Sequence, residues 1–129
     1  MILSPDDSLA WITYPFGSAV DVIDTLTSTV SHSLKISGAF DVAFDSAGTR
    51  AFVTNRSANS VLVIDTTTYA TVKSISVPGG PVEIRIAPDD VYAVVTSFDG
   101  NSLTYINLVT YTTSGVPTPG SPMGLALVQ

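Results

Sequence analysis

The fold of this chain of 129 residues is decided by a stretch in its middle, Arg50-Ala51-Phe52-Val53-Thr54-Asn55-Arg56-Ser57-Ala58-Asn59-Ser60-Val61-Leu62-Val63-Ile64-Asp65. Two runs rich in Val, Ile, Phe and Thr flank a short polar segment. β-Branched and aromatic residues favour strands, whereas Asn and Ser favour turns. The stretch therefore predicts two antiparallel strands joined by residues 56–59.

This pair of strands recurs on both sides of the middle copy. Residues 10–14 and 20–25 match it 41 residues earlier, and residues 93–97 and 103–108 match it 42 residues later. Each copy also has an apolar run before the pair and a further strand-like run after it, with turn residues such as Ser46-Ala47-Gly48 in between. A period near 40 with four strands per unit is typical of β-propellers.

We therefore expect an all-β fold, a partial β-propeller of three four-stranded antiparallel blades. The expected blades comprise residues 1–41, 42–83 and 84–124, and all three belong to one propeller segment, residues 1–129. Residues 125–129 repeat the opening strand of a unit, so they predict the first strand of a next blade.

The repeats resemble those of the YVTN family of β-propellers. The resemblance rests on Phe52-Val53-Thr54-Asn55 at the signature position and on Val-Ile-Asp-Thr at residues 22–25 and 63–66. That family contains surface-layer-type and other exported proteins, so the resemblance implies an extracellular, cell-surface or periplasmic location, although no signal peptide stands in this segment. Related propellers serve as scaffolds, adhesion modules, lactonases and redox-enzyme subunits, so the fold alone does not fix the function.

Composition argues against several classes of partner. The net charge is −6 and the five basic residues are scattered, so nucleic-acid binding is not expected. No apolar run approaches the roughly 20 residues of a membrane-spanning helix, so membrane insertion is not expected either. The chain has no cysteine, which excludes disulfides, thiolate metal ligands and cysteine nucleophiles.

Three blades leave the two outermost sheet faces uncovered. Closed propellers have about four to eight blades, so the predicted partners are other blades. These blades belong either to a longer chain or to a second copy that completes a six-bladed ring. In such a ring, residues 125–129 would compete with residues 1–5 for one innermost strand position, which favours the longer chain.

Candidate ligand contacts lie in the loops between the second and third strands of each blade and along the connections between blades. These positions differ between copies, so packing explains them less well, and they combine aromatic with charged side chains. The predicted ligand-binding residues are Phe16, Phe40, Asp41, Arg56, Glu83, Arg85 and Phe98. Such a set suits a sugar or a peptide, while the alternative is ordinary loop residues with a local Glu83–Arg85 ion pair.

No metal, cofactor or catalytic site is predicted. Asp24, Asp65 and Asn107 share one repeat position just after the third strand, where Asx side chains commonly cap turns. His32 is the only histidine and is expected on an exposed outer strand, which is a poor position for a general base.

The sequence favours a non-catalytic binding or scaffolding module of a cell-surface or secreted protein, with a protein or a carbohydrate as its ligand. One alternative is part of a propeller enzyme, such as a lactonase-like hydrolase or a redox-enzyme subunit. Convergence of at least three ionisable groups at the channel mouth would favour that alternative. Another is a structural repeat of a surface layer or filament, in which the open blade faces are the interfaces.

Overall fold

The computed structural model describes residues 1–125 as three four-stranded antiparallel sheets. Blade 1 contains β1 (Ile2–Leu3), β2 (Leu9–Thr13), β3 (Val20–Asp24) and β4 (Thr29–Leu34). Blade 2 contains β5 (Ala39–Phe44), β6 (Arg50–Asn55), β7 (Ser60–Asp65) and β8 (Thr71–Ser76). Blade 3 contains β9 (Pro81–Ile86), β10 (Tyr92–Ser97), β11 (Ser102–Asn107) and β12 (Thr113–Pro117).

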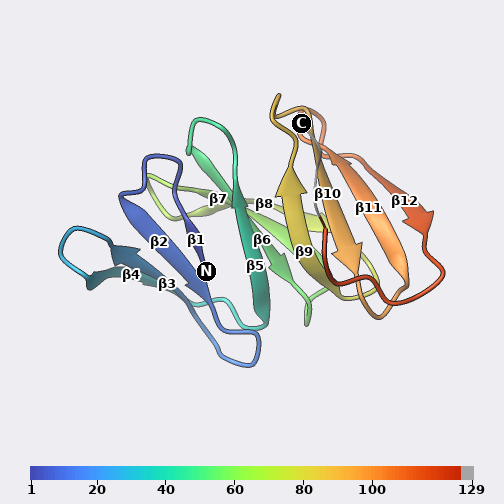
Figure 1. The fold of residues 1–129 in the computed structure, drawn as a ribbon, viewed down its shortest axis with the longest axis horizontal. Coiled ribbons are helices and arrows are strands. Elements are labelled where there is room, and N and C mark those ends of the chain that lie inside the picture. The colour runs from blue at the N-terminus through green and yellow to red at the C-terminus, as the bar shows by residue number, and fades with distance from the viewer. Residues whose placement is uncertain (126–129) are drawn as a thin grey trace.

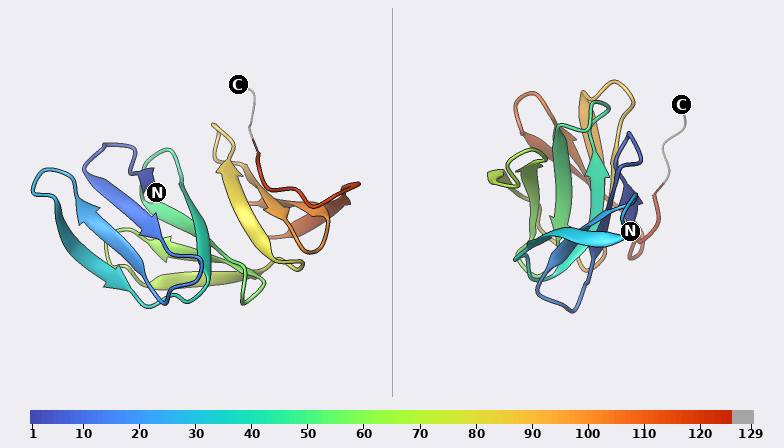
Figure 2. Two further views of the ribbon diagram at one scale, coloured as in Figure 1. Left: turned by 60° about the horizontal axis from the view of Figure 1, so that its bottom comes forward. Right: turned by 90° about the vertical axis from the view of Figure 1, so that its left-hand side faces the viewer.

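The blades lie side by side in chain order and follow an arc, as Figures 1 and 2 show. Within each blade the strands pair in chain order, each with the next. The predicted all-β partial propeller of three four-stranded blades is thereby confirmed. Of the further strand predicted at 125–129, residues 126–129 lie outside the described part of the chain.

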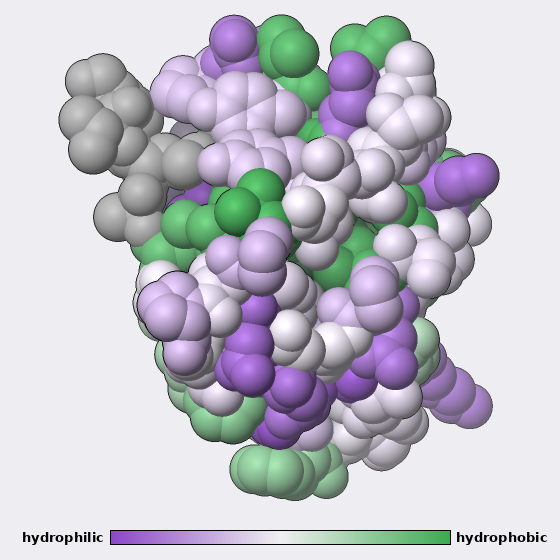
Figure 3. Space-filling view, turned by 90° about the vertical axis from the view of Figure 1, so that its right-hand side faces the viewer, coloured by the Kyte–Doolittle hydropathy of each residue, from purple (hydrophilic) through white to green (hydrophobic). Residues whose placement is uncertain are grey.

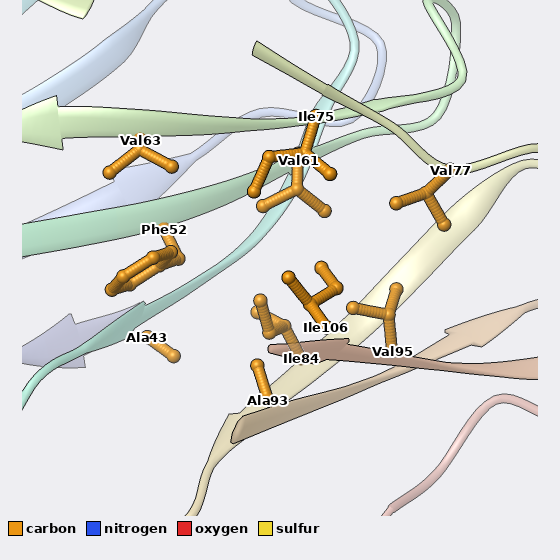
Figure 4. Packing of buried hydrophobic residues seen from close by; sticks show 10 residues of the cluster. All are labelled: Ala43, Phe52, Val61, Val63, Ile75, Val77, Ile84, Ala93, Val95 and Ile106. Atoms are coloured by element: carbon orange, nitrogen blue, oxygen red, sulfur yellow. The ribbon is translucent and has the colours of Figure 1, made fainter. Parts of the chain in front are cut away.

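Blade 2 lies between blades 1 and 3, so both faces of its sheet are buried. Successive side chains of a strand point to opposite faces. In β6, Phe52 faces blade 3, whereas Ala51 and Val53 face blade 1. The core between blades 2 and 3 is drawn in Figure 4 and comprises Ala43, Phe52, Val61, Val63, Ile75, Val77, Ile84, Ala93, Val95 and Ile106. The core between blades 1 and 2 comprises Trp11, Val20, Val22, Ile36, Ala39, Val42, Ala51, Val53 and Ile64.

The turns repeat together with the strands. Asp24 Oδ1 accepts hydrogen bonds from the backbone N–H groups of Leu26 and Thr27, at 2.9 and 3.0 Å. Asp65 and Asn107 make the same pair of contacts in blades 2 and 3. The predicted turn-capping role of this repeat position is therefore confirmed.

Two innermost strands begin earlier than the sequence suggested. β5 starts at Ala39 and β9 at Pro81, before the expected openings at residues 42 and 84. In both strands the pairing shifts register soon after the first residue. Such a shift interrupts the alternation of inward and outward side chains, so the start of the strand cannot be recognised from the sequence pattern. As a result, Phe40, Asp41 and Glu83 lie on innermost strands and not in the preceding connections.

The outer faces of blades 1 and 3 carry exposed apolar side chains. Leu3 and Val30 lie on the side of blade 1 that faces away from blade 2. Tyr105 and Val116 lie on the corresponding side of blade 3, and Figure 3 looks onto this side of the molecule and shows apolar surface between polar patches. Within residues 1–125 no helix is long and apolar enough to cross a membrane.

Candidate binding site

One end of the molecule gathers the loops that follow the second strand of each blade. Backbone hydrogen bonds tie these loops to the connections between blades: Gly38 N donates to Gly17 O at 3.4 Å, and Phe98 N donates to Gly80 O at 3.1 Å. Loops and connections therefore form one continuous surface, which we call the loop end.

An ion pair joins two blades at the loop end. Arg56, in the β6–β7 loop, donates to both carboxylate oxygens of Asp99 in the β10–β11 loop, with Nη2–Oδ1 at 2.8 Å and Nε–Oδ2 at 3.2 Å. The guanidinium carbon of Arg56 lies 5.4 Å from the centre of the Phe98 ring, within cation–π range. The hydrogen bond from Arg56 lowers the pKa of Asp99, and Asp99 in turn raises the pKa of Arg56.

A hollow of about 310 Å³ opens beside this ion pair. Its wall includes Phe16, Phe40, Arg56 and Asp99. Phe16 stands at the tip of the β2–β3 loop with its side chain fully exposed, at 101%. The Phe16 ring is therefore fully accessible at the edge of this hollow.

A second charged cluster lies on the innermost strands. Asp41 Oδ2, on β5, accepts hydrogen bonds from the Ile84 N–H and from Arg85 Nη1, both at 3.1 Å, across the junction between blades 2 and 3. Asp41 Oδ1 accepts from the N–H of Val42 at 2.9 Å. Arg85 Nη2 also pairs with Glu83, so the Glu83–Arg85 ion pair considered from the sequence is present. Arg85 therefore pairs with two carboxylates, those of Asp41 and Glu83.

A second hollow of about 310 Å³ adjoins the first. It is lined by Phe40, Asp41, Glu83, Met123 and Gly124. Phe40 borders both hollows. We define the loop-end site as these two hollows with the charged and aromatic side chains in and around them: Phe16, Phe40, Asp41, Arg56, Glu83, Arg85, Phe98 and Asp99.

Five of the seven predicted ligand-binding residues line the two hollows. The other two contact them, because Arg85 pairs with Asp41 and Glu83, and Phe98 lies under the guanidinium of Arg56. Asp99 follows Phe98 in the same loop but is not among the predicted residues. His32 lies away from this surface, on the exposed strand β4, where its ring stacks on Tyr69 at 3.9 Å between centres. Within residues 1–125 no group of three or more His, Asp or Glu side chains is placed to hold a metal ion.

Both arginines of the site are paired across a blade junction. Each of the two arginines is held by a carboxylate on a neighbouring blade, so the charges are fixed before any ligand arrives. Fixed side chains lose little conformational entropy on binding.

Comparison with known proteins agrees with this architecture. A family model described as YNCE-like beta-propeller matches residues 3–125. Among solved structures, the Kuenenia stuttgartiensis hydrazine synthase is 25% identical with a TM-score of 0.85, over 92% of this chain and 35% of that chain. No curated protein matches the sequence.

Two further solved structures share the fold at lower identity. The WD40 repeats of RRP9 are 13% identical with a TM-score of 0.82, over 93% of this chain and 38% of that chain. Dihydro-heme d1 dehydrogenase NirN, solved in complex with DHE, is 16% identical with a TM-score of 0.73, over 91% of this chain and 27% of that chain. The present chain therefore spans roughly a third of the length of the structures that it matches.

Proposed function

Because the chain belongs to the YNCE-like β-propeller family, we propose that it is a non-catalytic binding module that holds a peptide segment of a partner protein at its loop-end site. The observation that carries the proposal is the pair of hollows that share Phe40, with the exposed Phe16 lining one of them. Aromatic residues and arginines provide much of the energy in protein–protein contacts.

The presence of two neighbouring hollows favours an extended peptide over a single sugar. Two adjoining hollows of similar volume, separated by Phe40, can take two side chains of one extended peptide. One hollow borders the Arg56–Asp99 pair, and the other borders Asp41 and Glu83. The two subsites therefore differ in charge, which supplies a direction and a sequence preference to the bound peptide.

The test is selection of peptides from a random phage-displayed library on the immobilised chain, followed by calorimetric measurement of the selected peptides. We expect Phe16→Ala to weaken binding about tenfold or more, because hot-spot aromatic residues typically carry over 1 kcal/mol. Leu26→Ala is the matched control, since Leu26 is 93% exposed but lies in the β3–β4 turn, away from the site. Equal affinity for both variants, or failure to select any peptide, would contradict the proposal.

A second candidate function is a propeller subunit of an enzyme, and two observations favour it. Asp41, Glu83 and Arg85 converge at one junction, as such an enzyme requires. The hydrazine synthase structure is also 25% identical over most of this chain. Hydrolysis of a simple lactone such as γ-butyrolactone by this chain, lost on Glu83→Gln with the fold intact, would replace the binding proposal.

We also infer that the outer faces of blades 1 and 3 are covered by further blades, supplied by a longer chain or by a second copy. The exposed apolar residues Leu3, Val30, Tyr105 and Val116 support this inference. We place the module outside the cytoplasm, on its resemblance to exported YVTN-type proteins. Fractionation of cells that produce it tests the location.

A further inference from the structure

The two hollows of the loop-end site differ in their balance of charge. In the first hollow Asp99 accepts hydrogen bonds from Arg56 at both of its carboxylate oxygens, so these two charges are matched. The second hollow is bordered by the carboxylates of Asp41 and Glu83, which share a single arginine, Arg85. The group of two carboxylates and one guanidinium therefore keeps an excess of negative charge beside the second hollow.

This excess is available to a ligand at one oxygen of Glu83. Both oxygens of Asp41 are already in use, since Oδ2 accepts from the Ile84 N–H and from Arg85, and Oδ1 accepts from the Val42 N–H. Glu83 Oε1 pairs with Arg85. Within residues 1–125, Glu83 Oε2 accepts no hydrogen bond from a protein donor, so it can accept one from a ligand.

Glu83 Oε2 points to the part of the hollow that Gly124 borders. A Cβ built on Gly124 would have this oxygen as its nearest neighbour, at 3.9 Å. Gly124 has no side chain to cover the carboxylate, and both residues line the hollow. The side chain of Glu83 is 21% exposed, so a ligand in the hollow can contact it.

The repeat explains why Glu83 has no partner on a following blade. Asp41 and Glu83 stand at the same repeat position, 42 residues apart, and Asp41 binds Arg85 across the junction of blades 2 and 3. One repeat after Arg85 the sequence has Ala126, which carries no charge. Arg85 is therefore the only cationic side chain that these positions supply for the two carboxylates.

The other side chains of the second hollow suit a long aliphatic stem. Phe40 and Met123 line it together with the carboxylates. Lysine and arginine side chains pack their methylene stems on apolar surface and place the charged group at the end. An acidic ligand group would be repelled by the carboxylates, and an apolar one would leave Glu83 Oε2 without a hydrogen bond.

We propose that the second hollow binds a lysine or arginine side chain of the partner peptide, which donates a hydrogen bond to Glu83 Oε2 and packs its stem on Phe40 and Met123. This inference rests on the function proposed above and specifies its ligand. The partner segment carries a basic residue close to an apolar one, and the apolar side chain enters the first hollow between Phe16 and Phe40.

Selection from the random peptide library tests the charge preference. The library is applied in parallel to the wild type, to Glu83→Gln and to Asp89→Asn. Asp89→Asn is the matched control, because it also removes one negative charge but lies in the β9–β10 turn, at the other end of blade 3. We expect lysine or arginine to be enriched at one peptide position with the wild type and with Asp89→Asn, and this enrichment to be lost with Glu83→Gln.

The outcomes separate this inference from the proposed function. Peptides that bind the wild type without enrichment of a basic residue overturn the inference and leave the peptide-binding function in place. Failure to select any peptide overturns both. An enrichment that persists on folded Glu83→Gln, checked by circular dichroism, overturns the assignment to Glu83.

Calorimetry on a selected peptide then measures the contact itself. Replacing its basic residue by norleucine keeps an aliphatic stem and removes the charge. The replacement should weaken binding to the wild type about tenfold, as expected for loss of a hydrogen bond between charged groups. It should weaken binding to Glu83→Gln less than about twofold, because the partner charge is already absent. Unchanged affinity of the norleucine peptide for the wild type, or an equal loss with both proteins, overturns the inference.

Discussion

At the scale of the residue, the turn carboxylate Asp6 predicts an acid-sensitive contribution to stability. Hydrogen bonds from Ser4 and Ser8 lower its pKa to about 2 in the folded chain, below the value of about 3.9 for a free aspartate. A carboxylate with a lowered pKa stabilises the fold above the unfolded pKa, and this contribution is lost as the pH falls through the folded pKa.

We therefore expect the free energy of unfolding to fall between pH 4 and pH 2, and to fall less in Asp6→Asn. Urea denaturation across this pH interval measures the difference between the two proteins. Ser8→Ala, which removes one donor to the carboxylate, should raise the pKa of Asp6 as followed by NMR. Parallel pH profiles of the wild type and Asp6→Asn would refute this assignment.

The residues of the loop-end site illustrate what single positions reveal before a structure is known. Differences between repeat copies were sufficient to select Arg56, Phe98 and the inner-strand residues. Asp99 escaped because its partner stands 43 residues away, and no local pattern shows that pairing. The contacts of Asp41 with blade 3 span a similar separation, 43 and 44 residues. Charges of opposite sign about one repeat apart, in equivalent segments, are therefore the signal that would have found Asp99.

At the scale of the element, the connection between β8 and β9 depends on glycine. Gly79 has a φ of +88°, and a Cβ there would lie 2.8 Å from the Cα of Gly100 in the β10–β11 loop. Left-handed backbone costs about 1–2 kcal/mol for other residues, and the close contact adds to that. We expect Gly79→Ala to lower the free energy of unfolding by about 2 kcal/mol or more.

The chain offers a matched control for this prediction. Pro119-Gly120 repeats Pro78-Gly79, yet a Cβ at Gly120 would meet nothing within 4 Å and its φ is not left-handed. Gly120→Ala should therefore change the free energy of unfolding by less than about 0.5 kcal/mol. Urea unfolding of both variants measures these changes. Similar losses of unfolding free energy in Gly79→Ala and Gly120→Ala would show that the close approach of Gly79 to Gly100 is unimportant for stability.

Element type followed from the sequence, whereas element boundaries did not. The strands around Phe52 and Val63 are regular and rich in β-branched residues, so their pattern is unambiguous. β5 and β9 instead start before a break in register, where side-chain alternation fails. That shift places Asp41 and Glu83 on rigid strands, which is why their charges are held in fixed positions.

At the scale of the whole molecule, the number of blades and the propeller family could be predicted because three copies of the strand pattern recur 41–42 residues apart in the sequence. The membership in the YNCE-like family confirms the YVTN-type resemblance. Differences between the two blade junctions could not be predicted, since they depend on which side chain crosses the gap. Asp90 accepts hydrogen bonds from Ser46 across the junction of blades 2 and 3, whereas Gly48 and Pro5 border a cavity at the junction of blades 1 and 2.

The open outer faces yield the prediction that concerns the molecule as a whole. A chain of 13.5 kDa with exposed apolar sheet faces should associate at high concentration, since buried apolar area drives association. The double variant Tyr105→Glu/Val116→Glu adds charge to the outer face of blade 3 and should shift the solution mass to that of the monomer. Light scattering coupled to size exclusion measures this mass.

The control for this measurement places the same charges off the faces. Leu26 and Val109 are 93% and 78% exposed, but they lie in the turns before β4 and β12. Leu26→Glu/Val109→Glu changes the net charge equally, so it should leave the association intact if the sheet faces are the contact. An equal drop in mass for both double variants would mean that charge repulsion alone disperses the chain. A mass that only the face variant lowers would assign the contact to blade 3, the surface on which a further blade would pack.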